Sequence, residues 1–170
     1  DNTTSTITPA SLIITTSDVT KVYDAGVTAL GTAVAGGGTS LMSGDALVGG
    51  TFAFTDKNAG AGTKTVSVTG VTVNDGNSGA NYTISYANNT TSTITPYVVS
   101  LSGSRVYDGL ASVAAGDLTL GALVGGEVLN LGGAGSVATA NVGMGKTLSI
   151  GTLTLANGSS GASAGLASNY

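Results

Sequence analysis

The sequence predicts an all-β protein made of two small tandem modules. The string Asn-Thr-Thr-Ser-Thr-Ile-Thr-Pro occurs twice, at residues 2–9 and at residues 89–96, which indicates an internal repeat. The 170 residues include 28 glycines, many threonines and two prolines, a composition typical of short strands joined by tight turns. No stretch has the apolar spacing of a three-turn helix. Together these observations predict the fold class.

Further motifs recur in the same order in both halves of the chain. The Val-Tyr-Asp string at residues 22–24 returns at residues 106–108. Four other segments also return: residues 46–50 as 122–126, 58–62 as 141–145, 64–68 as 146–150, and 81–82 as 169–170. The expected organisation is a tail strand of a preceding module at residues 1–9, a first module at residues 10–96 and a second module at residues 97–170.

The second module is shorter than the first. It matches as far as Tyr170, the counterpart of Tyr82, whereas the first module continues through residues 83–96. We therefore expect the second module to lack its last strand and to present an open sheet edge, which is a template for pairing with another chain. The tail at residues 1–9 of a neighbouring molecule is the expected occupant. The modules are expected to follow one another end to end in an elongated arrangement.

The composition excludes several classes of function. Charged residues make up 8% of the chain and the net charge is −4, whereas nucleic-acid binding needs a basic surface. We therefore expect no nucleic-acid partner. No apolar run approaches the ~20 residues of a membrane-spanning helix, so no membrane insertion is expected. The absence of histidine and cysteine excludes Ser/His/Asp and Cys/His catalysis and metal sites with nitrogen or sulfur ligands.

The first elements of each module follow from residue type. Residues 11–16 and their counterparts at 97–102 are rich in β-branched side chains, which predicts a strand. The Val-Tyr-Asp string is expected to form a turn, in which Asp24 and Asp108 accept backbone N–H bonds. Residues 51–55 alternate between polar and apolar side chains and predict another strand.

The later elements include a change of parity. The apolar side chains of residues 64–74 change parity midway, and those of residues 146–155 do the same. Because side chains of a strand alternate between two faces, such a change puts half of them on the wrong face. We expect a bulge or bend at the glycine in each copy, Gly70 and Gly151. A strand buried on both faces is the alternative.

The last strand of the first module is expected to begin at Tyr82. Tyr82, Ile84 and Tyr86 alternate with polar residues, which predicts one long strand that leads through the second octapeptide to Pro96. The proline ends strand pairing and fixes a semi-rigid exit into the next module. The residues expected to shape the modules are Tyr23, Asp24, Gly70, Tyr82, Pro96, Tyr107, Asp108 and Gly151.

These motifs resemble a known family. The pieces that carry the resemblance are Val-Tyr-Asp at 22–24, Gly-Asp-Ala-Leu-Val-Gly-Gly at 44–50, Phe-Thr-Asp-Lys-Asn-Ala-Gly at 54–60, Asn-Tyr-Thr at 81–83 and Ile-Thr-Pro at 94–96. They are similar to the YDG/MBG-type tandem repeat domains of bacterial surface adhesins, which are filamentous-haemagglutinin-like and exported by two-partner secretion. The resemblance implies β-grasp-like or sandwich-like modules with a spacer or adhesive role and no catalytic residues. The second module lacks counterparts of Asp45 and of Asp56-Lys57.

Several side chains have a functional reading beside a structural one. Asp24 and Asp108 are weak candidates for calcium ligands, because calcium takes several oxygen ligands, and turn formation is the alternative. Lys64 is expected to mark a solvated strand start; an isopeptide crosslink would instead need a buried lysine beside a carboxylate. Asn-x-Ser/Thr sequons, which are candidate glycosylation sites or asparagine-rich turns, occur at Asn2, Asn81, Asn88, Asn89 and Asn157. The threonine row Thr91, Thr93 and Thr95 is either a hydroxyl-rich face for sugar or ice or the solvent side of a strand.

The expected function is structural. The modules would serve as stalk or spacer repeats of a large secreted adhesin that holds a binding region away from the cell, in adhesion and biofilm formation. The alternative is a module that binds a glycan or another surface protein through Tyr23, Tyr107, Tyr82 or Tyr86. A hydrolase using a carboxylate pair such as Asp45 and Asp56 is the third class.

We expect no enzyme activity and no cofactor. The expected partners are neighbouring modules of the same array, together with any host or bacterial surface glycan or protein that they bind. The expected location is the extracellular surface of a bacterial cell, Gram-negative by the resemblance.

Overall fold

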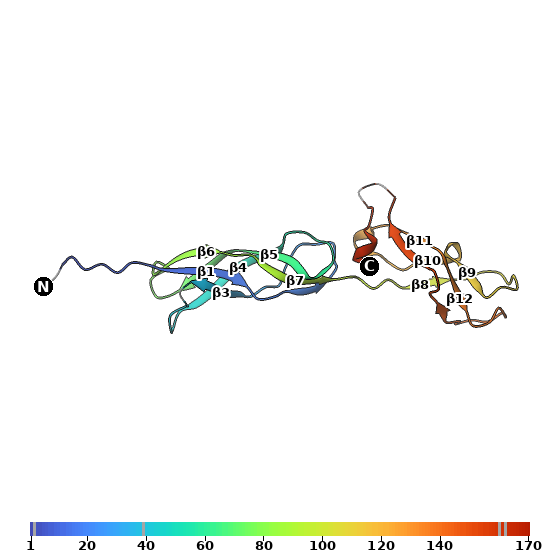
Figure 1. The fold of residues 1–170 in the computed structure, drawn as a ribbon, viewed down its shortest axis with the longest axis horizontal. Helices are drawn as coiled ribbons and strands as arrows, with labels where there is room; N and C mark the ends of the chain where they lie inside the picture. The colour runs from blue at the N-terminus through green and yellow to red at the C-terminus, as the bar shows by residue number, and fades with distance from the viewer. Residues whose placement is uncertain (2, 39, 160, 162) are drawn as a thin grey trace. The chain divides into compact units, whose positions relative to one another are not determined.

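The computed structural model describes residues 1, 3–38, 40–159, 161 and 163–170. Within these ranges the chain is built from strands, and its helical segments are three short 3-10 turns, η1 (Ala115–Asp117), η2 (Val124–Gly126) and η3 (Ala167–Asn169). The predicted all-β class is therefore confirmed (Figure 1). The chain divides into unit 1, comprising Asp1–Val22 and Gly26–Thr95, and unit 2, comprising Tyr23–Ala25 and Pro96–Tyr170.

Unit 1 contains two sheets. Its strands are β1 (Ala10–Thr16), β2 (Thr20–Val22), β3 (Ala33–Gly38), β4 (Ala46–Phe54), β5 (Gly60–Asn74), β6 (Tyr82–Tyr86) and β7 (Asn89–Thr95). One sheet has the order β3-β1-β6 and the other has the order β2-β7-β5-β4. β1 pairs with β6 in parallel and β2 pairs with β7 in parallel, whereas β5 runs antiparallel to both β4 and β7.

The core of unit 1 lies between strands of both sheets. Leu12 and Ile14 of β1 pack in one cluster with three valines of β5 and with Tyr82 of β6. The buried positions of β5 change parity between Val68 and Val71. Gly70 lies at this change with φ of 67°, a left-handed conformation that glycine adopts without steric cost. The bend expected from the sequence therefore lies at this glycine, and both halves of β5 face one core.

The second octapeptide forms β7, the inner strand between β2 and β5. The prediction of one long last strand from Tyr82 is wrong, because β6 and β7 are separate strands of different sheets. Ile94 is fully buried and Ser92 is 1% exposed. The Thr93 N–H donates to the carbonyl oxygen of Val19 at 2.8 Å, which fixes β7 against the segment before β2. The octapeptide is thus an integral strand of unit 1.

The first octapeptide has a different environment. Residues 3–9 lie outside any strand and are exposed. Ile7, which matches the fully buried Ile94 in the repeat, is 98% exposed. One sequence therefore occurs in two structural states, and the difference comes from the strands beside it.

Unit 2 has shorter strands and a smaller core. Its strands are β8 (Leu101–Gly103), β9 (Ser112–Ala114), β10 (Leu118–Leu120), β11 (Leu129–Gly132), β12 (Ala134–Val137), β13 (Leu148–Ser149) and β14 (Thr154–Asn157). They form the pairs β10-β8 and β11-β14 and the sheet β13-β12-β9. Its buried apolar side chains among the described residues are Tyr23, Val113, Leu129 and Leu153.

The unit 2 counterpart of β5 is broken into two short strands. β13 and β14 are separated by Gly151, which has φ of 59°, and a Cβ at this position would lie 2.6 Å from the carbonyl oxygen of Ala134. Ile150, the counterpart of the buried Val68, is 56% exposed. In unit 1 the long β5 is supported by β4 and β7 on its two edges. The first strand of unit 2 is also shorter than predicted. β8 contains only residues 101 and 102 of the predicted 97–102 segment, together with Gly103.

Candidate functional site

The Val-Tyr-Asp turns have the same internal support in both units. The residue before the motif is basic in each copy, Lys21 and Arg105. The Lys21 Nζ donates to the carbonyl oxygen of Gly26 at 2.8 Å. A guanidinium nitrogen of Arg105 donates to the carbonyl oxygen of Leu110, the counterpart of Gly26. A basic side chain therefore closes each turn by binding its last carbonyl, a role that the sequence reading missed.

The two candidate calcium ligands lie in these turns. Asp108 accepts the N–H of Leu110 at Oδ1, 2.9 Å away, and pairs through Oδ2 with the Arg105 guanidinium. Asp24 is exposed in the equivalent turn. Across the described residues, no three side chains of the His, Cys, Asp or Glu types come together as a metal site. The contacts of Asp108 are those of a turn-forming residue, and calcium binding stays a prediction.

A hydrogen bond from a tyrosine hydroxyl to a carboxylate occurs in both units. In unit 1 the Tyr82 hydroxyl donates to Asp45 Oδ2 at 2.6 Å and accepts the N–H of Met42 at 2.9 Å. Met42 and Asp45 are the ends of one tight turn, because the Asp45 N–H donates to the Met42 carbonyl oxygen. The hydrogen bond to Asp45 is the main cause that raises the pKa of Tyr82, because it favours the neutral phenol.

Unit 2 has the same tyrosine–carboxylate hydrogen bond, but its carboxylate comes from a position that does not align with unit 1. The Tyr170 hydroxyl donates to Glu127 Oε2 at 2.9 Å and accepts the N–H of Val124 at 3.1 Å. The Glu127 N–H closes the turn on the Val124 carbonyl oxygen. Burial, followed by the bond to Glu127, raises the pKa of Tyr170 to about 12. Glu127 thus supplies the carboxylate in unit 2, although it does not align with Asp45.

The remaining tyrosines of the sequence-based prediction lie in contrasting environments. Tyr23, counted with unit 2, is 1% exposed, and its hydroxyl donates to Glu127 Oε1 at 2.7 Å. Tyr107, its repeat counterpart, is 63% exposed. Tyr86 is 43% exposed and donates to the Val71 carbonyl oxygen at 3.0 Å. The burial of Tyr23 and Tyr82 removes two of the four aromatic side chains proposed for ligand contact.

Lys64 is the clearest departure from the sequence-based expectation. Instead of marking a solvated strand start, it is a buried residue whose side chain is 9% exposed. Its Nζ lies 2.5 Å from both carboxylate oxygens of Asp56. This hydrogen bond is the first cause that lowers the pKa of Asp56. An unpaired buried ammonium is costly, and the carboxylate of Asp56 supplies the opposite charge that lets Lys64 be buried. An isopeptide crosslink between Lys64 and Asp56 would show as the loss of one water from the intact mass.

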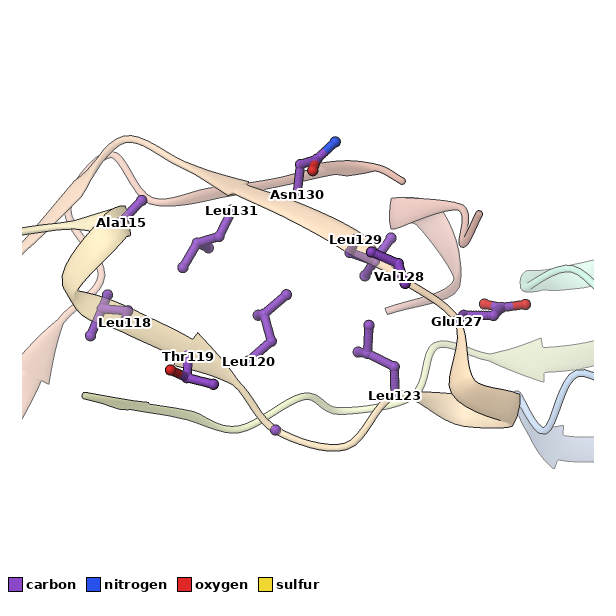
Figure 2. Close-up of a pocket in the computed structure, with 11 residues that line it drawn as sticks. Ala115, Leu118, Thr119, Leu120, Leu123, Glu127, Val128, Leu129, Asn130 and Leu131 are labelled. Carbon is purple, nitrogen blue, oxygen red and sulfur yellow. The ribbon is translucent and has the colours of Figure 1, made fainter. Parts of the chain in front are cut away.

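A leucine-lined cavity of about 520 Å³ lies between β10 and β11 in unit 2. Figure 2 shows Leu120 and Leu131 directed into the space between these strands, with Thr119 and Asn130 turned away. The lining includes no aromatic or basic side chain, and both oxygens of its carboxylate, Glu127, accept tyrosine hydroxyls. The cavity therefore offers mainly apolar contact surface.

A second groove of unit 2, of about 580 Å³, has two distinct flanks. One flank is residues 101–107, which include Val106 and Tyr107 of the Val-Tyr-Asp turn, and the other is residues 139–146. Apolar side chains at both flanks are exposed, with Val106 at 89% and Met144 at 100%. The Lys146 Nζ donates to the Thr139 carbonyl oxygen at 3.1 Å instead of to a carboxylate.

The geometry defines a chain of two tandem β units with repeated turns. The YDG domain model matches residues 8–93 and residues 89–170, so the chain belongs to the YDG domain family and contains two copies. No curated protein and no solved structure matches the chain significantly. The two family matches overlap in β7, the strand formed by the second octapeptide. None of the described helical segments qualifies as a candidate membrane span.

Proposed function

We propose that the two YDG domains are spacer repeats of a large secreted bacterial surface adhesin, and that they hold a binding region away from the cell. The observation that supports this proposal most is the position of β7. It is an inner strand of unit 1 and it leads directly through Pro96 into unit 2. A covalent path that runs from an inner strand of one unit into the next unit would carry tension between them.

The strand directions of unit 1 suit a load along the chain. The chain enters the unit at β1 and leaves it at the end of β7, and β7 pairs in parallel with β2. Tension between the entry and the exit therefore acts along parallel strands and loads their hydrogen bonds in shear. In this geometry several bonds must break together, which resists extension more than sequential opening does. This behaviour is what a spacer needs.

The spacer proposal is tested by the dimensions of the chain in dilute solution. Small-angle scattering from residues 1–170 is expected to give an elongated particle, with the two units following one another. A compact particle with the units side by side would contradict the proposal. The cellular location has a separate test. Antibodies against these units are expected to label intact, unpermeabilised cells of the bacterium that produces the protein.

The alternative is a module that binds a glycan or another surface protein. Among the tyrosines proposed for this role, Tyr86 and Tyr107 are the exposed ones. A glycan array probed with residues 1–170 tests this function. Signals that disappear in Tyr107→Ala or Tyr86→Ala would favour it over the spacer role.

A further inference from the structure

The groove that β7 fills in unit 1 has two identifiable flanks. On one side Lys21 and Val22 of β2 pair in parallel with Ile94 and Thr95. On the other side Gly60 of β5 lies opposite Ile94 in the antiparallel register. The Gly62 N–H also donates to Thr93 Oγ1 at 2.8 Å. The octapeptide is therefore held by the Val-Tyr-Asp segment and by the glycine-rich start of β5.

Polar side chains of the octapeptide add specific bonds in unit 1. The Ser92 Oγ accepts the N–H of Val19 at 3.0 Å. Asp18 accepts the hydroxyl of Thr91 at 2.6 Å and the side-chain amide of Asn89 at 2.7 Å. These contacts explain why the string is rich in threonine, serine and asparagine, because most of its side chains have a partner in the groove.

Unit 2 carries sequence counterparts of residues on both sides of this groove. Arg105 and Val106 are the repeat counterparts of Lys21 and Val22, and Gly143 and Gly145 are the counterparts of Gly60 and Gly62. All four residues line the second groove described above. In the described part of unit 2 no strand runs between these flanks. Neither of these two segments is a strand in the described part of unit 2, and Val106 is exposed beside the groove, so docking would pair them with an added strand.

The chain carries a second copy of the strand that fits such a groove. Residues 2–9 have the same sequence as residues 89–96. Residues 3–9 lie outside any strand, and Ile7 is 98% exposed. Ile7 has high β propensity and is flanked by threonines, which also favour strands, so this segment suits strand pairing.

We propose that residues 2–9 of one molecule dock as a strand in the second groove of unit 2 of another molecule. The unit 1 register places Ile7 opposite Arg105 on one side and opposite Gly143 on the other. Thr6 then takes the position of Thr93, with its hydroxyl accepting the N–H of Gly145. The occupant is a second copy of this chain, recognised by backbone pairing and by burial of Ile7.

The assembly that follows is directional. The donated segment lies at the start of the chain and the accepting groove lies in unit 2, so the two surfaces in contact are different. Such heterologous contacts add molecules head to tail and leave a free donor and a free groove at the ends. The proposal concerns self-association and is independent of cell-surface location, so it stands or falls separately from the spacer function.

A synthetic peptide of residues 1–9 tests the docking directly. The acceptor is the chain 10–170, which retains every strand of both units because residues 3–9 belong to none. We expect saturable binding by fluorescence anisotropy. An Ile7→Asp peptide is expected to bind about tenfold or more weakly, because it removes the buried apolar side chain. A Thr3→Asp peptide is the matched control, because Thr90, the counterpart of Thr3, is exposed in unit 1, and it should bind within about twofold of the unmodified peptide.

The position of docking is tested by hydrogen exchange on the same complex. The peptide is expected to slow amide exchange in residues 104–107 and 143–146. Protection at the leucine-lined cavity instead would overturn the assigned site. No saturable binding, or equal binding of the Ile7→Asp peptide, would overturn the proposal itself.

Self-association of residues 1–170 is the second test of the proposal. Light scattering of residues 1–170 is expected to show a mass that increases with concentration. The Ile7→Asp chain and the chain 10–170 are expected to remain monomeric, whereas the Thr3→Asp chain should associate as the unmodified chain does. A mass that is independent of concentration for the unmodified chain would contradict head-to-tail exchange.

Discussion

At the residue scale, the two Val-Tyr-Asp turns differ at the position after the aspartate. Gly109 has φ of 81° and Ala25, its counterpart, has φ of 62°. Both residues are in the left-handed region, where a side chain costs roughly 1–2 kcal/mol. The family motif places glycine here for a conformational reason, and one copy of the turn tolerates alanine at a cost.

Replacement of Ala25 by glycine is expected to stabilise the chain. Relief of the left-handed strain exceeds the entropy that glycine adds to the unfolded state, so the free energy of unfolding should rise by up to about 1 kcal/mol. The reciprocal change, Gly109→Ala, should lower it by a similar amount. No atom lies within 4 Å of a Cβ placed on Gly109, so this cost is conformational and not steric. Urea unfolding of both variants measures the pair, and equal effects of the same sign would contradict the explanation.

The tyrosine at the end of unit 2 gives a pH prediction. The pKa of Tyr170 is raised to about 12, mainly by burial and then by its bond to Glu127. The unfolded chain ionises near the usual tyrosine pKa of about 10. The stability that Tyr170 contributes is therefore fully present below about pH 10 and is lost as pH rises towards 12.

This prediction is checked by ultraviolet titration of the phenolate. The difference between the titrations of the unmodified chain and of Tyr170→Phe is expected to show one phenol that ionises near pH 12. A difference curve centred near pH 10 would show that the Tyr170 hydroxyl is solvated and not held by Glu127.

At the element scale, the sequence predicted the strands whose pattern is local. The β-branched run of β1, the alternation of β6 and the parity change of β5 all correspond to observed elements. The carboxylate partners of the tyrosines were not predictable. Asp45 and Glu127 lie 37 and 43 residues from their tyrosines and at positions that do not align between copies. The burial of Lys64 was missed for a similar reason, because it depends on the position of Asp56 after folding.

The repeat comparison did not predict how long the strands of unit 2 are. Residues 146–155 carry the same apolar pattern as residues 64–74 of β5, yet this part of unit 2 contains two short strands, β13 and β14. A strand is stabilised by its neighbours on both edges, and sequence pattern alone does not state which neighbours are present. The same reasoning applies to the octapeptide, which is a strand in one position and not in the other.

Ser92 is the residue through which this account of β7 is most easily tested. Its Oγ accepts the buried Val19 N–H, so Ser92→Ala leaves that donor without a partner. We expect the free energy of unfolding of unit 1 to fall by about 1–3 kcal/mol. Thr90→Ala on the same strand is the control, because Thr90 is exposed, and it should change stability by less than about 0.5 kcal/mol. Equal effects in thermal or urea unfolding would contradict the assigned contact.

At the scale of the whole molecule, the repeated octapeptide determines how the units are completed. In unit 1 it is an inner strand that carries the chain towards unit 2. In unit 2 the counterpart residues line a groove with exposed apolar side chains. Under the proposed spacer function, one string would serve both as closing strand and as junction between successive YDG domains. The same string gives separate molecules a means of pairing.

The octapeptide is a closing strand only when it lies in a groove such as the one between β2 and β5. The chain contains its own control, because Thr6 and Thr93 have identical neighbours and therefore similar intrinsic exchange rates. The Thr93 N–H is bonded to the Val19 carbonyl oxygen, whereas residues 3–9 are exposed and lie outside any strand.

Amide hydrogen exchange of these two threonines is the most direct measurement. In dilute solution Thr93 is expected to exchange more slowly than Thr6 by a factor on the order of 100 or more, because its exchange requires opening of the sheet. As the protein concentration rises, Thr6 should become protected while Thr93 stays unchanged. Equal exchange of the two amides in dilute solution would contradict the claim that β7 is an integral strand of the module.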